Sequence, residues 1–536
     1  MTTVAATIAA ALADSGVERV FGLPGGEIVE LLDEVRKQGI DFVLVRNESS
    51  ALFMADAYAR ATGRPAVCMT TLGPGAANAV MGVAHCYLDR SPVLIFTAQK
   101  PQSLLPDYTH QVIDQHALFA PITKATVKIQ PGNAHSAIPD ALNLAVEGRP
   151  GPVHLQVSTE DAVAETTADG GAGSPFVPHK PTPVAAHELA SAQEILSGAR
   201  RPLIVAGLGV EPQRPYAAIR ALAESVGAPV VVTPKAKGAL AADHPLSAGT
   251  IGLTSTDPVY DLLEEADCVV AVGFDVVELV KPWTWDRPFI WVAPWSNEDP
   301  RLNASNELVG DMSSALFALA DVVAEKDVSW GEARVGEFLG RPLAAPPPMQ
   351  SGTLSPQAVL RVMREVAQRD AFLAVDVGAH KIYSSLAWPA YEPNRFLLSN
   401  GLSSMSYALP AAIGAALAAP RSQVLCLTGD AGLAMNMGEL GVLRERNLPV
   451  VVIVLSDGAI DLIRSHQRRA GKPVFATEFS PPNHAQIGAA FGLAARRVED
   501  EDALSSALAQ FLDAQSPALI EVILDPTGYP TTPKSK

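Results

Sequence analysis

The repeated alternation of short apolar runs with amphipathic helical stretches limits the fold of this chain more than any other feature. The runs are rich in β-branched residues and lie at residues 42–45, 66–69, 93–97, 202–206, 230–233, 268–272, 372–375, 424–427 and 450–455. Strands that are apolar on both faces and separated by helices indicate parallel sheets covered on both sides. The pattern therefore predicts an α/β protein whose ligands lie at the carboxyl ends of the strands.

Two segments have the composition of exposed linkers. Residues 166–182 are rich in Gly, Ser, Thr and Pro, and residues 341–352 are rich in Pro, which suits extended connections and not a packed core. They divide the 536 residues into pieces at 1–165, 183–340 and 353–530, each of ordinary domain length. Because each piece repeats the strand and helix pattern, we predict three doubly wound parallel-sheet domains.

The composition bears on partners and on the compartment. The formal net charge is −17, which argues against nucleic acid or an anionic membrane as the main partner. The four cysteines (Cys68, Cys86, Cys268 and Cys426) are far apart and form no CxxC pair, so we expect buried thiols in a reducing cytosol. The N-terminus lacks a basic region before its apolar stretch, and Thr2 or Thr3 is expected to cap an amphipathic helix that ends near Gly16. A cytoplasmic protein without membrane spans is predicted.

Two aspartates follow expected strands in the third piece. Asp430 lies in the turn Thr-Gly-Asp-Ala-Gly, before a helix expected at about residues 434–446, and Asp457 follows the run at 450–455. A Gly-rich turn brings backbone N–H groups to an anion, and two carboxylates at neighbouring strand ends can share one Mg²⁺ that also takes phosphate oxygens. Read alone, such a turn is also a common helix cap.

The 27-residue spacing from Asp430 to Asp457 resembles the fingerprint of thiamine-diphosphate enzymes. The resemblance implies that Asp430, Asp457 and the carbonyl of Ala459 hold a metal that binds the cofactor's diphosphate. It also implies that a loop following residues 372–375 closes over the other side of the diphosphate. The residues so implied to contact the cofactor are Gly378, Ala379, His380, Gly429, Asp430, Ala431, Gly432, Asp457, Ala459 and Ile460. Two departures are visible, because Ala431 replaces a glycine and Ser456-Asp457 replaces a pair of asparagines.

The first piece resembles the part of this family that binds the pyrimidine ring. Read alone, Glu48 is a favourable charge at a helix N-terminus; the resemblance implies that it hydrogen-bonds N1′ of the aminopyrimidine and promotes loss of the thiazolium C2 proton. Gly73-Pro74-Gly75 resembles the loop that packs near this ring. The other residues implied to contact the cofactor are Gly26, Pro74, Asn78, Ser403 and Met405, the last as a wedge that bends it. The three pieces would then be the pyrimidine-binding (PYR), central and diphosphate-binding (PP) domains of the acetolactate synthase and pyruvate decarboxylase family.

Residues 108–124 resemble a segment of the flavin-independent, catabolic acetolactate synthases. The segment reads YTHQVIDQHALFAPITK. The resemblance implies decarboxylation of a 2-oxo acid, with pyruvate favoured, and carboligation to a second carbonyl. Gln111 would act beside the reacting carbon as a catalytic residue. The residues implied to shape the substrate pocket are His110, Leu462, Ile463 and His466; relatives carry glutamine or tryptophan at the place of His466.

Other functions stay open on the sequence alone. They are a different 2-oxo acid decarboxylase, carboligase or lyase with another acceptor, a non-catalytic relative, and a pyruvate oxidase-like flavoenzyme. Gly207-Leu208-Gly209 resembles a dinucleotide-type turn without a complete GxGxxG, and FAD is not expected. Arg464, Arg468 and Arg469 are expected on a solvated basic face. The family resemblance implies a homodimer or homotetramer with active sites at the subunit interface, and small-molecule 2-oxo acids as substrates.

Overall fold

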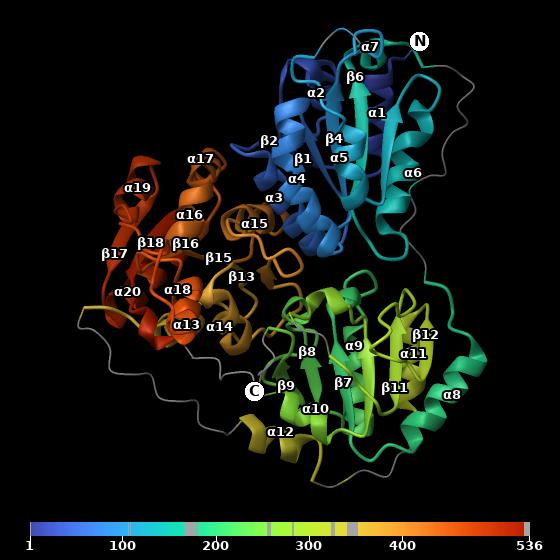
Figure 1. Cartoon of the computed structure of the whole chain (residues 1–536), viewed down its shortest axis with the longest axis vertical. Helices are drawn as coiled ribbons and strands as arrows, with labels where there is room; N and C mark the ends of the chain where they lie inside the picture. The colour runs from blue at the N-terminus through green and yellow to red at the C-terminus, as the bar shows by residue number, and fades with distance from the viewer. Residues whose placement is uncertain are drawn as a thin grey trace. The chain divides into compact units, whose positions relative to one another are not determined.

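The protein contains three six-stranded sheets in which all paired strands are parallel. A computed structural model describes residues 2–105, 107, 109–166, 176, 181–253, 259–280, 283–322, 327, 329–339 and 352–529. Helices lie on both faces of each sheet (Figure 1), which confirms the predicted α/β class with three doubly wound sheets. Most of both predicted linkers, 166–182 and 341–352, lies outside the described residues.

The first sheet has the strand order β2-β1-β3-β4-β6-β5. Its strands are β1 (Arg19–Leu23), β2 (Asp41–Leu44), β3 (Ala66–Thr70), β4 (Val93–Gln99), β5 (Ala125–Ile129) and β6 (Val153–Ser158). Its helices are α1 (Val4–Asp14), α2 (Val29–Lys37), α3 (Glu48–Thr62), α4 (Gly73–Leu88), α5 (Gln115–Phe119), α6 (Ala134–Val146) and α7 (Thr159–Val163). Thr3 caps α1 by accepting from the Ala6 N–H at 3.2 Å, as predicted. Both β3 and β4 are buried along their whole length, which explains their continuous apolar sequences.

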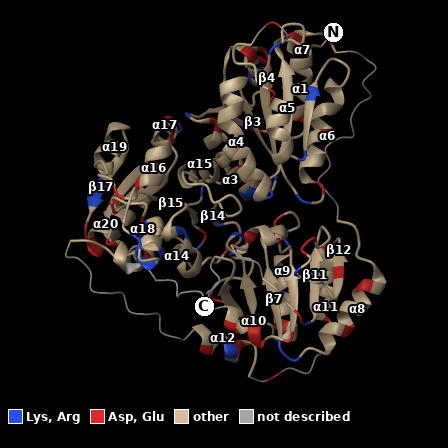
Figure 2. Ribbon diagram, in the orientation of Figure 1, with Lys and Arg blue, Asp and Glu red and all other residues tan. Residues whose placement is uncertain are grey.

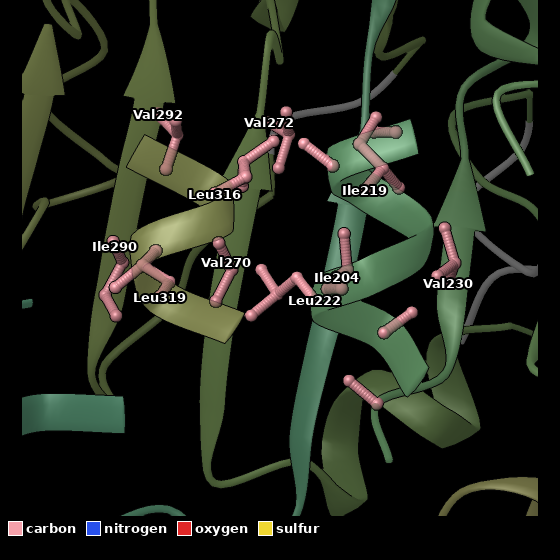
Figure 3. Packing of buried hydrophobic residues seen from close by; sticks show 14 of the residues in the cluster. Ile204, Ile219, Leu222, Val230, Val270, Val272, Ile290, Val292, Leu316 and Leu319 are labelled. Carbon is pink, nitrogen blue, oxygen red and sulfur yellow. The ribbon is translucent and has the colours of Figure 1, made fainter. Parts of the chain in front are cut away.

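The central sheet has the order β12-β11-β10-β7-β8-β9, which is the arrangement found in dinucleotide-binding folds. Its strands are β7 (Pro202–Ala206), β8 (Val230–Val232), β9 (Ser247–Thr250), β10 (Cys268–Val272), β11 (Phe289–Ala293) and β12 (Asn306–Val309). Its helices are α8 (Ala186–Ser197), α9 (Tyr216–Val226), α10 (Tyr260–Glu265), α11 (Met312–Ala320) and α12 (Glu332–Leu339). Figure 3 shows Leu222 of α9 and Leu316 of α11 pointing onto β7, β10 and β11, so these two helices close one face of the core.

The third sheet has the order β14-β13-β15-β16-β18-β17, the same winding as the first. Its strands are β13 (Phe372–Val375), β14 (Phe396–Leu398), β15 (Val424–Gly429), β16 (Val450–Ser456), β17 (Ala494–Val498) and β18 (Ala518–Ile523). The helices of this part of the chain are α13 (Pro356–Val366), α14 (Ala379–Ala387), α15 (Ala408–Ala418), α16 (Asp430–Asn436), α17 (Leu440–Glu445), α18 (Asp461–Arg469), α19 (His484–Ala490) and α20 (Glu501–Asp513). The single helix expected at 434–446 is wrong. The chain instead forms α16, a 3₁₀ turn η6 (Met437–Glu439) and α17, with Gly438 lying in the turn, as suits a residue that disfavours helix interiors.

The strand order of each sheet reverses at one point, between β1 and β3, between β7 and β10, and between β13 and β15. Ligands of open α/β sheets bind in the crevice that such a switch leaves at the carboxyl ends of the strands. The residues expected around the diphosphate follow β13, β15 and β16. Gly26 begins a 3₁₀ turn after β1, and Pro74 lies in the first turn of α4 after β3. The two connections touch, since an ideal Cβ on Gly25 would lie 2.3 Å from Thr71 Oγ1.

The described residues fall into two compact units. The first takes in described residues within 1–179, 401–420 and 436–446, and the second those within 180–400, 421–435 and 447–536. In the first unit α15 packs along α3 so closely that an ideal Cβ on Gly414 would lie 2.2 Å from the Met54 carbonyl oxygen. The Lys, Arg, Asp and Glu residues lie mainly on helices and loops, although β17 also carries basic residues (Figure 2). All four cysteines are buried thiols, as predicted, and no helix of the described chain is long and apolar enough to cross a membrane.

Candidate active site

Two carboxylates with buried side chains mark the carboxyl edge of the third sheet. β15 and β16 are neighbours with Gly429 paired to Leu455, so Asp430 and Asp457 leave the sheet side by side. Asp430 is 2% exposed, and the Asp457 side chain is 8% exposed. The Asp430 Oδ2 atom accepts from the N–H groups of Asp457 and Gly458 at 3.2 and 2.8 Å. The predicted pairing of these aspartates at adjacent strand ends is therefore seen in the geometry.

The electrostatics of this pair favour a nearby positive charge. Burial, followed by the neighbouring carboxylates of Asp430 and Asp461, raises the pKa of Asp457 to about 7. Burial likewise raises the pKa of Asp430. Carboxylates held close together in a dry place favour either a proton or a cation. Among the described residues no group of three or more His, Cys, Asp or Glu could hold a metal by itself, so a metal here would take part of its shell from backbone and ligand oxygens.

Arg464 lies beside this pair and corrects one expectation. It is 7% exposed and does not lie on a solvated basic face. Its guanidinium donates to Asp461 Oδ1 at 2.8 Å and stands 3.7 Å from Asp457 Oδ2. Asp461 and Arg464 lie one turn apart on α18. The first turn of this helix therefore places a buried cation beside Asp457. The exposed Arg468 and Arg469 do lie on the solvent side.

The loop after β13 closes against the loop after β15. Thr428 donates its hydroxyl to Asp376 Oδ2 at 2.8 Å, and an ideal Cβ on Gly432 would lie 2.2 Å from the same oxygen. An ideal Cβ on Gly429 would lie 3.4 Å from His380 Cε1. The segment from Gly378 to His380 thus forms one wall of a cradle whose floor is Gly429 to Gly432.

The backbone of the cradle accommodates the departures from the family pattern. Ala431 has an ordinary negative φ, since it is not among the positive-φ residues, so replacing the family's glycine costs no strain. Ala459 is buried, and Ile460 is 38% exposed. The Ile460 N–H donates to the Thr477 carbonyl at 2.8 Å, which fixes the turn that carries Ala459.

Glu48 lies at the first residue of α3, where Asn47 caps the helix by accepting from the Ser49 N–H at 2.9 Å. Its side chain is buried, and its Oε2 accepts from the Asn78 side-chain amide on α4. An ideal Cβ on Gly75 would lie 3.3 Å from Glu48 Oε1, so only glycine at this place leaves the carboxylate uncovered. The structure therefore brings Glu48, Asn78 and the Gly-Pro-Gly turn together.

Gln111 lies over the same turn. It has a φ of 62°, and an ideal Cβ on Gly73 would lie 2.2 Å from its carbonyl oxygen. Gln111 and the adjacent His110 are exposed, as are Gly26 and Pro74. Tyr108, which opens the family-like segment, lies outside the described residues.

The remaining predicted residues are partly or largely exposed. Ser403 is exposed with a φ of 53°, and Met405 is half-buried just before α15. On α18, Leu462 is half-buried, Ile463 is 49% exposed and His466 is exposed.

Two buried acids, one in each compact unit, were not predicted as functional residues from the sequence. Asp376 follows β13 directly and accepts from the Thr428 hydroxyl. Glu439 lies on η6 and accepts from the Arg46 N–H at 3.0 Å, two residues before Glu48. Burial raises the pKa of Glu439 to about 7. Its only sequence signal is a lone acid in an otherwise apolar stretch, which does not reveal a partner 393 positions away.

The chain matches three family descriptions in order. They are the N-terminal TPP binding domain of thiamine pyrophosphate enzymes at residues 2–118, their central domain at 189–319 and their C-terminal TPP binding domain at 376–522. The fold, the site and these matches together define a thiamine-diphosphate-dependent enzyme.

The comparison with individual proteins narrows the class. The acetolactate synthase isozyme 1 large subunit of Escherichia coli (strain K12) is 31% identical over 550 residues, covering 97% of this chain and 94% of that one. The acetolactate synthase large subunit of Parasynechococcus marenigrum (strain WH8102) is 30% identical, with 99% and 89% covered. The acetolactate synthase of Bacillus subtilis (strain 168) is 29% identical, with 96% and 92% covered. The chain belongs to the acetolactate synthase-like family of thiamine pyrophosphate enzymes.

The residues present fit the cofactor that this family uses. An ideal Cβ on Gly378 would lie 2.6 Å from His380 Cε1 and one on Gly432 would lie 2.2 Å from Asp376 Oδ2, so glycine at these two places lets the segments after β13 and β15 approach each other closely. His380 Nε2 is buried and has no hydrogen-bond partner among the described residues, which suits an atom whose bonding a ligand oxygen would complete. The Arg464 guanidinium lies within 4 Å of carboxylate oxygens of Asp457, Asp461 and Glu478, and Asp430 lies beside Asp457. This excess of negative charge suits a divalent cation.

Proposed function

We propose that this enzyme decarboxylates pyruvate and joins the resulting two-carbon unit to a second 2-oxo acid, as an acetolactate synthase does. The observation that carries the proposal is the match to an acetolactate synthase over 97% of the chain. Two groups of residues agree with it: Glu48 with Asn78 and Gly75 in the first sheet's domain, and Asp430 with Asp457 at the carboxyl edge of the third sheet. Bound thiamine diphosphate supplies an electron sink for decarboxylation. Everything else depends on what this chain's side chains hold and exclude.

The aspartate pair is proposed to bind Mg²⁺ and through it the diphosphate. Asp430, Asp457 and the Ala459 carbonyl are hard oxygen donors of the kind Mg²⁺ prefers, and diphosphate oxygens and water would complete the shell. The Gly378–His380 loop is proposed to close over the phosphates. The Asp457 and Gly458 N–H groups hold Asp430 Oδ2, and the Ala431 N–H holds its Oδ1 at 2.7 Å. The turn therefore fixes the orientation of this carboxylate.

Glu48 is proposed as the catalytic acid–base group on the pyrimidine side. Its buried carboxylate, oriented by Asn78, can exchange a proton with a ring nitrogen in a place that excludes water. Gly26, Pro74, Ser403 and Met405 are proposed to contact the rest of the cofactor. Gln111, fixed over Gly73, is proposed to hydrogen-bond the substrate near the reacting carbon.

The acceptor pocket is proposed to involve His110, Leu462, Ile463 and His466. His466 differs from the glutamine or tryptophan expected at this place, and an imidazole can donate to a second carboxylate or carbonyl. This residue favours a second candidate function: carboligation of the pyruvate-derived unit to an acceptor other than pyruvate.

The central sheet is proposed to bind no flavin. The Gly207 turn has the position of a phosphate-binding turn, yet the Leu208 N–H donates to Glu278 Oε2 at 2.7 Å. An ideal Cβ on Gly209 would lie 2.7 Å from Trp295 Cη2. The Trp295 indole and the Glu278 carboxylate therefore occupy the space beside the Gly207 turn where a phosphate would bind.

We therefore expect the purified protein to show no flavin absorbance band and to gain none when titrated with FAD. Visible absorbance of protein purified without added cofactor, followed by equilibrium dialysis against FAD, measures this. One flavin per chain after dialysis would overturn the proposal for the central sheet without affecting that for the thiamine site.

The function is tested by incubating the enzyme with ¹³C-pyruvate, thiamine diphosphate and Mg²⁺ and following products by NMR. Acetolactate with release of CO₂ is the expected result, because the carboligation step consumes a second pyruvate. Acetaldehyde would indicate a decarboxylase, and no conversion of pyruvate alone but conversion with an added second carbonyl compound would indicate another acceptor. Omission of thiamine diphosphate is the control, and turnover without it would contradict the proposal.

Assembly and location rest on the family resemblance. We also propose that the protein is a homodimer or homotetramer with active sites at the subunit interface and that it is cytoplasmic. The proposed domain limits are 1–165, 183–340 and 353–530. The matched segments 2–118, 189–319 and 376–522 fall within these limits and support them.

A further inference from the structure

A cluster of buried polar side chains lies between α3, α4 and the segment that leads into α15, all within the first compact unit. Its members are Asp56, Arg60, His85, Asp89, Ser91 and Tyr407. Asp56 Oδ2 lies 3.1 Å from His85 Nε2 and accepts from the Tyr407 hydroxyl at 2.7 Å. Asp56 Oδ1 accepts from Arg60 Nε at 2.8 Å. His85 Nδ1 lies 3.0 Å from Asp89 Oδ2.

The geometry surrounds the two buried carboxylates with hydrogen-bonding groups. Each ring nitrogen of His85 lies at hydrogen-bond distance from a carboxylate oxygen, Nε2 from Asp56 and Nδ1 from Asp89. The Arg60 guanidinium supplies a cation to Asp56, and buried charges are tolerated where they are paired and hydrogen-bonded.

Asp89 extends the cluster to the chain segment that precedes α15. Its Oδ1 accepts from the Gly401 N–H at 2.7 Å, while its Oδ2 meets His85. Tyr407 reaches Asp56 from six residues further along the same segment. The loop 401–406, which contains Ser403 and Met405, is therefore tied at both of its ends to the same charged cluster.

The cluster joins the three elements that carry the proposed pyrimidine-side residues. Helix α3 begins with Glu48, about two turns before Asp56, and α4 carries Pro74 and Asn78 before His85. Since Asn78 already bonds Glu48, α3 and α4 are fixed at two separate points along their lengths. Two fixed points set both the rotation and the axial position of one helix against the other, and a displacement of about 1 Å at a reacting group can cost on the order of 100-fold in rate.

We propose that the Asp56–His85–Asp89 cluster is a positioning unit that sets the loop 401–406 against Glu48, with His85 as its central residue. The inference deepens the proposed function and rests on it for its catalytic part. None of the residues in the cluster needs to touch the substrate or the cofactor. The cluster would fix the position of the loop 401–406 through its bonds to the Gly401 N–H and the Tyr407 hydroxyl. It would fix the position of Glu48 through α3 and α4.

The first test measures amide hydrogen exchange in the cofactor-free protein, comparing wild type with His85→Gln, Asp89→Ala and Asp89→Asn. The asparagine side chain keeps an oxygen for the Gly401 N–H and offers an N–H to His85 Nδ1, so it can preserve both bonds of Asp89. His154→Gln is the matched control, because His154 is a buried histidine of the same unit that bonds Thr97 of β4 at 2.8 Å.

We expect amides of residues 401–406 to exchange at least about 10-fold faster in His85→Gln and Asp89→Ala than in His154→Gln, as local opening becomes easier. Asp89→Asn should stay close to wild type. Unchanged exchange at 401–406 in Asp89→Ala, or equal exchange in Asp89→Ala and Asp89→Asn, would overturn the proposal. This readout needs no cofactor and no substrate, so it stands whether or not pyruvate is the donor.

The second test uses the loaded enzyme. At saturating cofactor, kcat should fall by about 10-fold or more in His85→Gln, with KM for pyruvate little changed, and should recover in Asp89→Asn relative to Asp89→Ala. A variant that loses stability to heat but keeps the kcat of its folded fraction would show a merely structural role. If the enzyme does not turn over pyruvate, hydrogen exchange alone tests whether the cluster fixes the loop 401–406.

Discussion

Replacing Glu48 with Gln is expected to leave a folded protein that binds thiamine diphosphate and converts pyruvate about 100-fold to 10,000-fold more slowly. Glutamine has the same shape, and its oxygen can still accept from the Asn78 amide, so the local bonds to α4 survive. What it lacks is the ability to take up and release a proton. The loss should therefore appear in kcat and not in KM for pyruvate.

The measurement combines product formation by NMR with calorimetric titration of the cofactor. Asp33→Asn removes an exposed carboxylate of α2 that pairs with Arg36 and Lys37 on its own helix; it is the matched control and should behave as wild type. Full turnover by Glu48→Gln would remove Glu48 from its proposed acid–base role. Loss of cofactor binding together with turnover would instead assign it to holding the cofactor.

Replacing Asp430 with Ala is expected to weaken retention of thiamine diphosphate by at least about 100-fold, since even indirect partners of metal ligands contribute roughly 10-fold to 100-fold in affinity. Asp430 is one of two carboxylates at this edge, and its removal also frees the Asp457 and Gly458 N–H groups. Asp430→Asn keeps an acceptor for those N–H groups and lacks the charge. Comparing cofactor retention in the two variants separates the contribution of the bound cation from that of the hydrogen bonds in the turn.

The experiment is gel filtration of loaded protein with and without EDTA, followed by assay of the bound cofactor. Wild type should keep the cofactor without EDTA and lose it with EDTA. Both Asp430 variants should lose it in either buffer. Asp502→Asn, at an exposed residue near the start of α20, serves as the surface control. Retention of cofactor by Asp430→Ala in EDTA would refute the metal site.

Features encoded locally in the sequence were predicted well. The strands β7, β10 and β13 begin and end where the apolar runs do, because a strand buried on both faces leaves a continuous signal. The adjacency of Asp430 and Asp457 followed from two strand ends in one parallel sheet. The single helix predicted at 434–446 was wrong because the chain forms a 3₁₀ turn at Gly438. The apolar periodicity on which the prediction was based does not reveal this interruption.

Features that depend on pairing across the chain were not predicted. Arg464 has the same sequence context as Arg468 and Arg469, and only the packing of α18 against the aspartate turn buries it. Glu439, Asp56 and His85 each look ordinary when read alone. Their roles arise from partners on other helices, which no local pattern records.

The division of the first compact unit among distant segments has a consequence for biosynthesis. Helix α3 is buried along most of its length, and part of what covers it is α15, which lies more than 340 residues later in the chain. A nascent chain therefore exposes the face of α3 that α15 covers until residues 408–418 have been synthesised. Contacts of such long sequence separation slow folding and prolong exposure to aggregation. We therefore expect the N-terminal third to have an incomplete core when it is made by itself.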